Sequence, residues 1–229
     1  MLDRSPLFER LHQATRLAHR RLERRMALCC PHFDLYDYRR LLQDFLGFYK
    51  PLERKLIVLA GPLLPSRYLL QRCKVPHLEQ DLLSLGMTEA DLARLPLCGR
   101  LPAAPSLPQA FGVLYAIDDP PVEGLIAGMH ALEKLGIDPS RGASFFSRSR
   151  EPMDEYGEEF KHAMTSAVGE PELHILAVEA AVETLNCFES WLEYRHRPQR
   201  ADHSPRHAWS KYRPFNMSPA DRDRVSGAA

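Results

Sequence analysis

Three polar side chains near the start of the chain have types and spacing suited to chemistry at a single site. Thr15, His19 and Glu23 are separated by steps of four residues, which places them on one face of a helix. His19 also falls within the apolar stripe of that helix, so we expect its imidazole to point inward. A neutral imidazole nitrogen there can bind a metal ion such as iron, while Glu23 accepts a hydrogen bond from the ring's second nitrogen. On spacing alone, the alternative is a core histidine that is paired with a neighbouring carboxylate.

The helix that positions these residues is indicated by side chains that recur at every third or fourth position, ending near Cys30 and Pro31. They are Phe8, Leu11, Thr15, Ala18, Leu22 and Met26. Asp34 and Asp37 have the spacing of a second helix start, and the helix is expected to run through Pro51 to Gly61. Further helices are predicted at about 66–85 (interrupted by Pro76), 88–94, 107–118, 121–135, 139–147, 151–168 and 171–195. No alternating strand pattern is evident, so the sequence predicts an all-α, single-domain helical bundle.

The amino-acid composition limits the kinds of molecule that the protein is expected to bind. The chain has 229 residues, 45% of them hydrophobic, and its 30 Lys and Arg residues balance 30 Asp and Glu residues. This balance argues against a dedicated binder of nucleic acid or anionic lipid. Apolar runs are far shorter than the roughly 20 residues of a membrane-spanning helix. The charged N-terminus, MLDRSPLFER, is unlike a signal peptide, so we expect a soluble, cytoplasmic protein with no membrane partner.

The helical domain is predicted to span residues 1–197, and a polar, proline-containing and loosely held tail is predicted at 198–229. Trp209, Tyr212 and Phe215 are large for a free tail, so part of it is expected to contact the body or a partner. The five cysteines are odd in number, and the adjacent Cys29 and Cys30 lack metal-site spacing. We therefore interpret the cysteines as reduced, structural thiols.

Four segments of the chain carry a resemblance to a known family. The segment ATRLAHRRLE, residues 14–23, resembles the proximal-helix motif of the haem oxygenases, in which the histidine is the axial iron ligand. FGVLYAIDD, residues 111–119, is similar to the approach to the distal helix in bacterial members, particularly those associated with bacteriophytochromes. LGIDPSRGASFF and AVETLNCFESWLE are similar to later parts of the family. The resemblance covers about residues 7–195 and implies a haem-oxygenase-like fold.

The resemblance assigns roles to individual residues. His19 matches the ligand to the haem iron, and Glu23 matches the carboxylate that steadies it, with Thr15 on the same face. Tyr115 matches the tyrosine before the distal helix and is read either as a contact to the haem edge or as plain core. Arg16 is a candidate partner for a haem propionate, and its alternative role is a solvated surface arginine. Other candidates for that contact are Arg20, Arg148 and Arg150.

The distal segment departs from the family pattern. Where the bacterial motif is rich in glycine, this chain has Asp119, Pro120, Pro121, Val122, Glu123 and Gly124, so only Gly124 remains in register. Gly124 and Gly128 have one-turn spacing and either present a smooth face to haem or let two helices approach. Asp118 and Asp119 are the candidate catalytic residues because they can organise distal water; capping of the next helix is the alternative.

Two other histidines are rival ligands. His12 replaces His19 if the register of the first helix is misjudged, and His130 is a possible second axial ligand that would block oxygen.

The resemblance implies oxidative opening of haem to biliverdin, carbon monoxide and iron, with haem as both substrate and cofactor. Electrons then come from an external donor, such as a reductase or ferredoxin, and a link to a bacteriophytochrome is expected from the subtype. One alternative is a haem-binding carrier or sensor without turnover, favoured by the altered distal segment. Another is a protein of the same fold that has lost haem and acts through another ligand or a protein partner.

Overall fold

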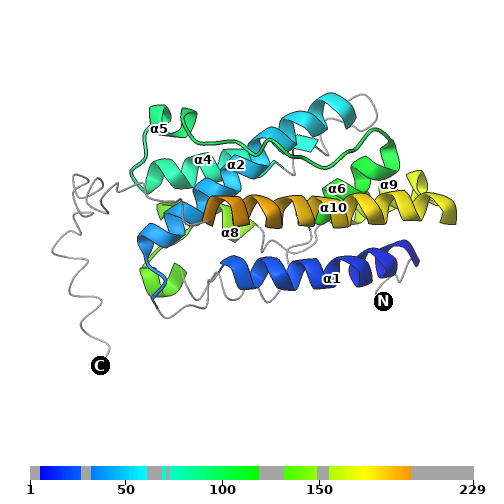
Figure 1. Cartoon of the computed structure of the whole chain (residues 1–229), viewed down its shortest axis with the longest axis horizontal. Coiled ribbons are helices and arrows are strands. Elements are labelled where there is room, and N and C mark those ends of the chain that lie inside the picture. The colour runs from blue at the N-terminus through cyan, green and yellow to red at the C-terminus, as the bar shows by residue number, and fades with distance from the viewer. Residues whose placement is uncertain are drawn as a thin grey trace. The chain divides into compact units, whose positions relative to one another are not determined.

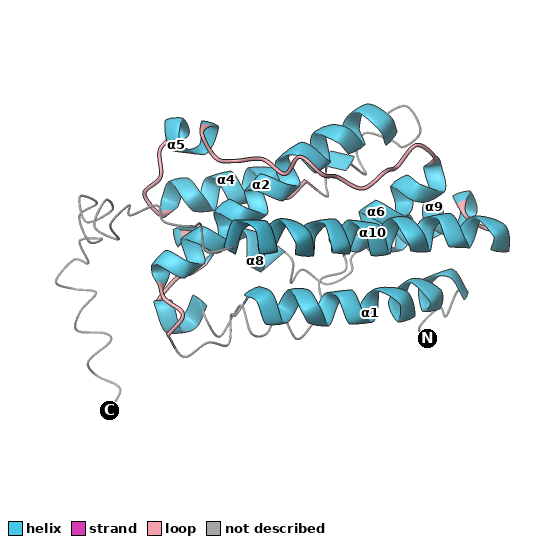
Figure 2. Ribbon diagram, in the orientation of Figure 1, coloured by secondary structure: helices cyan, strands magenta, loops and turns pink. Residues whose placement is uncertain are grey.

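A computed structural model describes residues 6–26, 32–60, 69–70, 73–118, 132–148 and 155–196. Within these ranges the chain is helical and contains no strand, which confirms the predicted all-α fold (Figures 1 and 2). The helices are α1 (Pro6–Met26), α2 (Leu35–Ala60), α4 (Val75–Ser84), α5 (Glu89–Ala93), α6 (Leu107–Asp118), the 3₁₀ helix η1 (Pro139–Arg141), α8 (Ser144–Arg148), α9 (Glu155–Ala167) and α10 (Pro171–His196). Residues 132–135 are also helical. None of the described helices is long and apolar enough to cross a membrane.

The described residues belong to one unit, Met1–His196, and the chain divides after it. The second unit, Arg197–Ala229, contains the predicted tail and lies outside the described residues, as do Cys29, Cys30 and most of the helix predicted at 121–135. The predicted end of the helical domain at residue 197 stays a prediction.

Helix α1 buries one stripe of its surface, as its sequence pattern predicts. Leu7, Leu11 and Leu22 are at most 5% exposed, and polar Thr15 and His19 are buried beside them. The Thr15 hydroxyl donates to the carbonyl of Leu11 at 2.8 Å, so its burial leaves no unsatisfied donor. The stripe therefore accommodates polar groups at the positions of the sequence motif.

Helices α1 and α10 lie side by side and run in the same direction (Figure 1). Arg21 contacts Glu189 at 2.7 Å and the side-chain oxygen of Asn186 at 2.8 Å, and Arg25, one turn later, reaches Glu189 and Glu193. Each step of four residues along α1 is thus matched by a similar step along α10. Because these pairs are partly exposed, they set the register of the two helices more than they stabilise the fold.

Helix α6 lies against α10 at a glycine. A Cβ atom at Gly112 would lie 2.1 Å from the carbonyl oxygen of Ala177, a distance that no real side chain tolerates. Residues 110–117 are all buried, so α6 is a central helix of the bundle. Glycine at this position lets two backbones approach more closely than any side chain would allow.

Helix α2 begins as predicted. Asp34 accepts from the N–H of Asp37 at 2.9 Å, and Asp37 accepts from the N–H of Asp34 in return. The helix continues through Pro51, which lacks an N–H group and so leaves the carbonyl of Gly47 without a helical donor. The N–H of Cys98 donates to this carbonyl at 2.8 Å. The proline therefore creates the point at which the connector between α5 and α6 attaches to α2.

Two predicted helices differ in the structure. The predicted helix at 66–85 is not interrupted at Pro76: residues 73–74 are non-helical, and Pro76 lies in the first turn of α4, where a missing N–H costs nothing. The single helix predicted at 139–147 is wrong. Residues 139–141 form η1, Gly142 has a φ of 106°, and α8 starts at Ser144. The left-handed backbone at Gly142 turns the chain between them.

Candidate functional site

His19 is buried at one edge of the α1 stripe. It is 8% exposed, and its Nε2 atom is inaccessible to solvent. Arg21, which faces α10, lies about 160° away around the helix, so His19 is on the side of α1 turned away from its pairs with α10. This confirms that the imidazole points into the protein, as its place within the apolar stripe predicts.

Glu23 lies one turn after His19 and is half-buried. Its Oε1 atom is buried and accepts no hydrogen bond from the part of the chain that the structure describes. A buried carboxylate oxygen is costly unless a donor meets it, so this position calls for a hydrogen-bonding or positively charged partner. An imidazole N–H one turn earlier on the same face is the donor that the sequence suggests; the orienting role of Glu23 remains a prediction.

The rival ligand on the same helix is in a different environment. His12 lies two turns before His19 and is exposed, whereas His19 is buried. The choice of His19 over His12 as the ligand stays a prediction. Arg16 and Arg20 are exposed on the flank of α1 next to His19 and Glu23. Their positions are compatible with propionate contacts at a rim. Their assignment remains a prediction.

An aromatic contact joins this side of α1 to α6. The rings of Phe8 and Tyr115 are 6.1 Å apart, and Phe8 lies on the same edge of α1 as His19, three turns earlier. Tyr115 is 8% exposed, which agrees with its reading as core and leaves its reading as a haem contact untested. Asp118 follows Tyr115 by three residues on the same face of α6. The contact between Phe8 and Tyr115 therefore brings the start of α1 close to the end of α6.

Asp118 forms an ion pair that the sequence analysis missed. Its Oδ1 atom lies 3.5 Å from the Nζ atom of Lys74, and both side chains are about 15% exposed or less. Lys74 precedes α4, and its backbone N–H donates to Glu53, a carboxylate of α2 that is only 8% exposed. Lys74 and Asp118 are too far apart in sequence for a local pattern to link them. Glu53 could have been identified from the sequence, because it is a charged residue one turn after Tyr49 on the buried face of α2.

The remaining sequence candidates lie outside the described residues. They are Asp119, Pro120, Pro121, Glu123, Gly124, Gly128, His130 and Arg150; the side chain of Arg148 is likewise not described. The shape of the predicted distal wall therefore remains a prediction.

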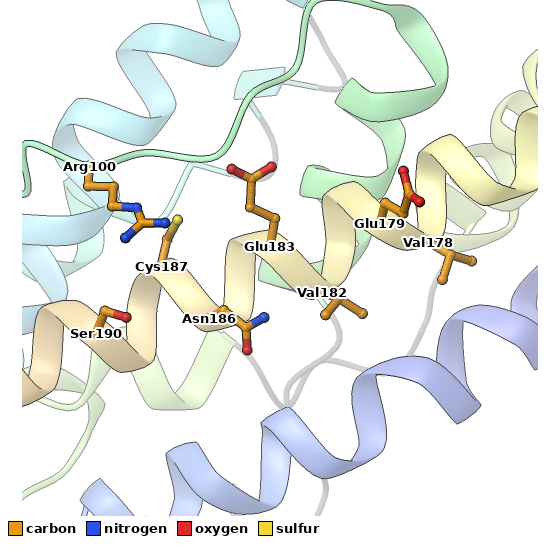
Figure 3. A pocket seen from close by; sticks show the side chains of 8 residues that line it. All are labelled: Arg100, Val178, Glu179, Val182, Glu183, Asn186, Cys187 and Ser190. Atoms are coloured by element: carbon orange, nitrogen blue, oxygen red, sulfur yellow. The ribbon is translucent and has the colours of Figure 1, made fainter.

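Among the hollows lined by described residues are two that border α10. One is a groove of about 390 Å³ beside α10, where Arg100 points toward Cys187 and Glu183 lines the wall (Figure 3). The other, of about 440 Å³, lies between Arg10 on α1 and His174 on α10. Arg10 is about 180° around the helix from His19. Neither hollow includes a residue that the sequence analysis assigned to the site.

Three of the cysteines lie within the described ranges. Cys73, Cys98 and Cys187 form no disulfide. Burial raises the pKa of the Cys73 thiol to about 11 and also raises the pKa values of Cys98 and Cys187. Such thiols are protonated at neutral pH and unreactive. No group of three or more His, Cys, Asp or Glu side chains suited to a metal ion occurs among the described residues.

The donor set around His19 fits the group implied by the resemblance. Haem iron takes a single axial imidazole from the protein, so no cluster of ligands is required. A buried histidine with a buried carboxylate oxygen one turn away supplies that ligand and an acceptor to orient it.

Comparison with known proteins agrees with this geometry. A family model described as heme oxygenase matches residues 5–194, a span that begins before α1 and ends near the end of α10. No curated protein matches the chain. The matched span contains His19, Glu23, Tyr115 and Asp118, and family membership implies haem as the ligand. On the extent of this match, the chain belongs to the haem oxygenase family.

Proposed function

We propose that the protein cleaves haem oxidatively to biliverdin, carbon monoxide and iron, with His19 as the axial ligand. The observation that carries the proposal is the burial of His19 one turn from the buried Oε1 atom of Glu23. A histidine that is merely part of the core can also pair with a neighbouring carboxylate, and the family match favours the role of a ligand. A histidine that holds iron needs an acceptor that fixes its ring and its tautomer.

The residues of α1 hold and orient the ligand. Haem, when bound, supplies the iron that activates molecular oxygen and is itself the molecule that is cleaved. His19 would hold the iron through its unprotonated ring nitrogen, and Glu23 would accept the N–H of the other nitrogen. Thr15 donates its proton to Leu11, so its hydroxyl oxygen faces the site as an acceptor only. Arg16, exposed on the flank, is placed to meet a propionate.

The opposite wall begins at the end of α6. In the proposal Asp118 holds water on the distal side, together with Asp119, while Gly124 and Gly128 provide a backbone surface without side chains. Electrons come from an external donor of the reductase or ferredoxin type. The association with a bacteriophytochrome and the cytoplasmic location are further predictions that follow from the resemblance.

The test is a titration of the purified chain with hemin. We expect a Soret band that saturates at one equivalent for the wild type and for His12→Ala, and that weakens and shifts for His19→Ala. His12 is the matched control because it lies on the same edge of α1, two turns earlier, but is exposed. Reduction with ascorbate in air, with catalase present, is then expected to replace the wild-type band by the spectrum of biliverdin.

Two other results would assign a different function. A His19-dependent band that persists under ascorbate would identify a haem carrier or sensor and would place the cause in Pro120, Pro121 and Glu123. If His19→Ala binds hemin as the wild type does, or neither binds it, His19 is a core residue and the fold serves another ligand or a protein partner.

A further inference from the structure

Lys74 lies where three helices meet. Lys74 precedes α4, its ammonium group lies 3.5 Å from Asp118 at the last residue of α6, and its backbone is bound to α2. The ammonium and carboxylate side chains are 15% and 14% exposed, so water screens this pair less than it screens the surface pairs between α1 and α10. The pair is therefore strong enough to fix the position of a side chain.

The backbone of Lys74 is fixed by Glu53. Its carboxylate Oε1 accepts the N–H of Lys74 and that of Val75 at 3.3 Å. Burial raises the pKa of Glu53, while these hydrogen bonds lower it. A carboxylate buried in α2 thus holds the start of α4, so the lysine reaches Asp118 from a rigid base.

Asp118 lies at the end of α6 that contacts the start of α1. Tyr115 and Asp118 share one face of α6, and Tyr115 contacts Phe8 on the edge of α1 that carries His19. Asp118 is also the last residue of α6, the point from which the chain departs toward the predicted distal segment. A lysine that holds this carboxylate fixes the direction in which the carboxylate points.

We propose that Lys74 is a positioning residue for the haem reaction, which acts by holding the Asp118 carboxylate at the distal side of the bound haem. This inference rests on the proposed function. It assigns a role in the reaction to the residue that precedes α4, which acts through Asp118, and it predicts that the reaction needs a cation at this position.

The experiment compares Lys74→Met and Lys74→Arg with Lys50→Met. Lys50 is the matched control because it pairs with Glu79 at 2.7 Å, and so also joins α2 to α4, but lies away from Asp118. The first readout uses the apo protein: a carboxyl ¹³C NMR titration, with the Asp118 signal identified by its loss in Asp118→Asn. Removing a cation at this distance is expected to raise the pH at which Asp118 takes up a proton by about one unit.

The second readout uses the haem complex. In Lys74→Met we expect hemin affinity to stay within about twofold of the wild type while the rate of biliverdin formation at saturating hemin falls about tenfold or more. Lys74→Arg is expected to restore both the titration and most of the rate, and Lys50→Met to change neither. A purely structural lysine would not separate affinity from rate in this way.

Several results would overturn the inference. An unchanged titration of Asp118 in Lys74→Met shows that the lysine does not govern the carboxylate. A shifted titration with an unchanged rate shows that the pair serves the fold alone. An equal loss of rate in Lys50→Met points to general loosening between α2 and α4. In all three cases the wild type is active, whereas a wild type that does not consume haem refutes the proposed function and this inference with it.

Discussion

Asp81, on α4, is a buried carboxylate that accepts the backbone N–H groups of Ser144 and Phe145 at 2.8 Å each. It thereby caps the start of α8 from a distant part of the chain. The hydroxyl of Tyr38 donates to the carbonyl of Gly142 at 2.7 Å and holds the same corner. Two buried side chains thus fix the turn at which the predicted helix 139–147 breaks.

The same carboxylate makes stability depend on pH. Burial raises the pKa of Asp81 to about 6, above that of an unfolded aspartate, so the folded state binds the proton more tightly. The wild type therefore gains stability as the pH falls through 6. Between pH 7 and pH 5 its free energy of unfolding is expected to rise by about 1 kcal/mol relative to Asp81→Asn, measured by urea unfolding at both pH values. Equal slopes for the two proteins would show that Asp81 is ionised throughout this range.

At the residue scale, local spacing predicted the part of the site that lies on a single helix. The step of four residues identified Thr15, His19 and Glu23, because all three face one way on α1. The Lys74–Asp118 pair depends on how α4 and α6 are brought together, which no spacing within one helix reveals. Such pairs are set by tertiary packing, so spacing within one helix could not predict them.

At the scale of elements, the contact between α6 and α10 depends on one missing side chain. Gly112→Ala is expected to destabilise the protein by about 3 kcal/mol or more, because the new Cβ would overlap the carbonyl of Ala177 and two helix backbones would have to separate. Gly99→Ala is the control: a Cβ there meets nothing within 4 Å, so a change of at most about 0.5 kcal/mol is expected in urea unfolding. A small effect of Gly112→Ala would mean that these helices are farther apart in solution.

Helix boundaries were predictable where the residues that end or begin a helix are close to it in sequence. They were missed where the boundary depends on a residue far away in sequence. Thr88 and Asp91 form a capping box, and the predicted helix there matches α5. The break at Gly142 was missed because a glycine within an otherwise helical pattern does not by itself determine its φ. The left-handed conformation is fixed there by Tyr38, more than a hundred residues away in sequence. Apolar periodicity thus locates helices, whereas long-range hydrogen bonds decide where some of them end.

At the scale of the whole molecule, α10 contacts α1, α2 and α6, so the ends of this helix determine how firmly the bundle is closed. At its C-terminal end, the fully buried Asp44 of α2 accepts from Arg195 at 2.6 Å and lies 2.9 Å from the ring of His196. The indole of Trp191 donates to the Asp44 backbone carbonyl at 2.7 Å. One residue of α2 therefore binds the last two turns of α10.

This arrangement predicts a large cost for removing a single carboxylate. Asp44→Ala deletes two charge-assisted hydrogen bonds and leaves a gap against Arg195, which is only partly able to recover water, so we expect a loss of about 2 to 4 kcal/mol. Glu79→Ala, which breaks the more exposed pair with Lys50, is expected to cost less than about 1 kcal/mol. Urea unfolding followed by circular dichroism compares the two. Equal losses of stability would mean that burial adds nothing to the Asp44 contacts and that α10 is held by its apolar face alone. A larger loss for Asp44→Ala would mean that this buried carboxylate contributes to holding α10 against α2.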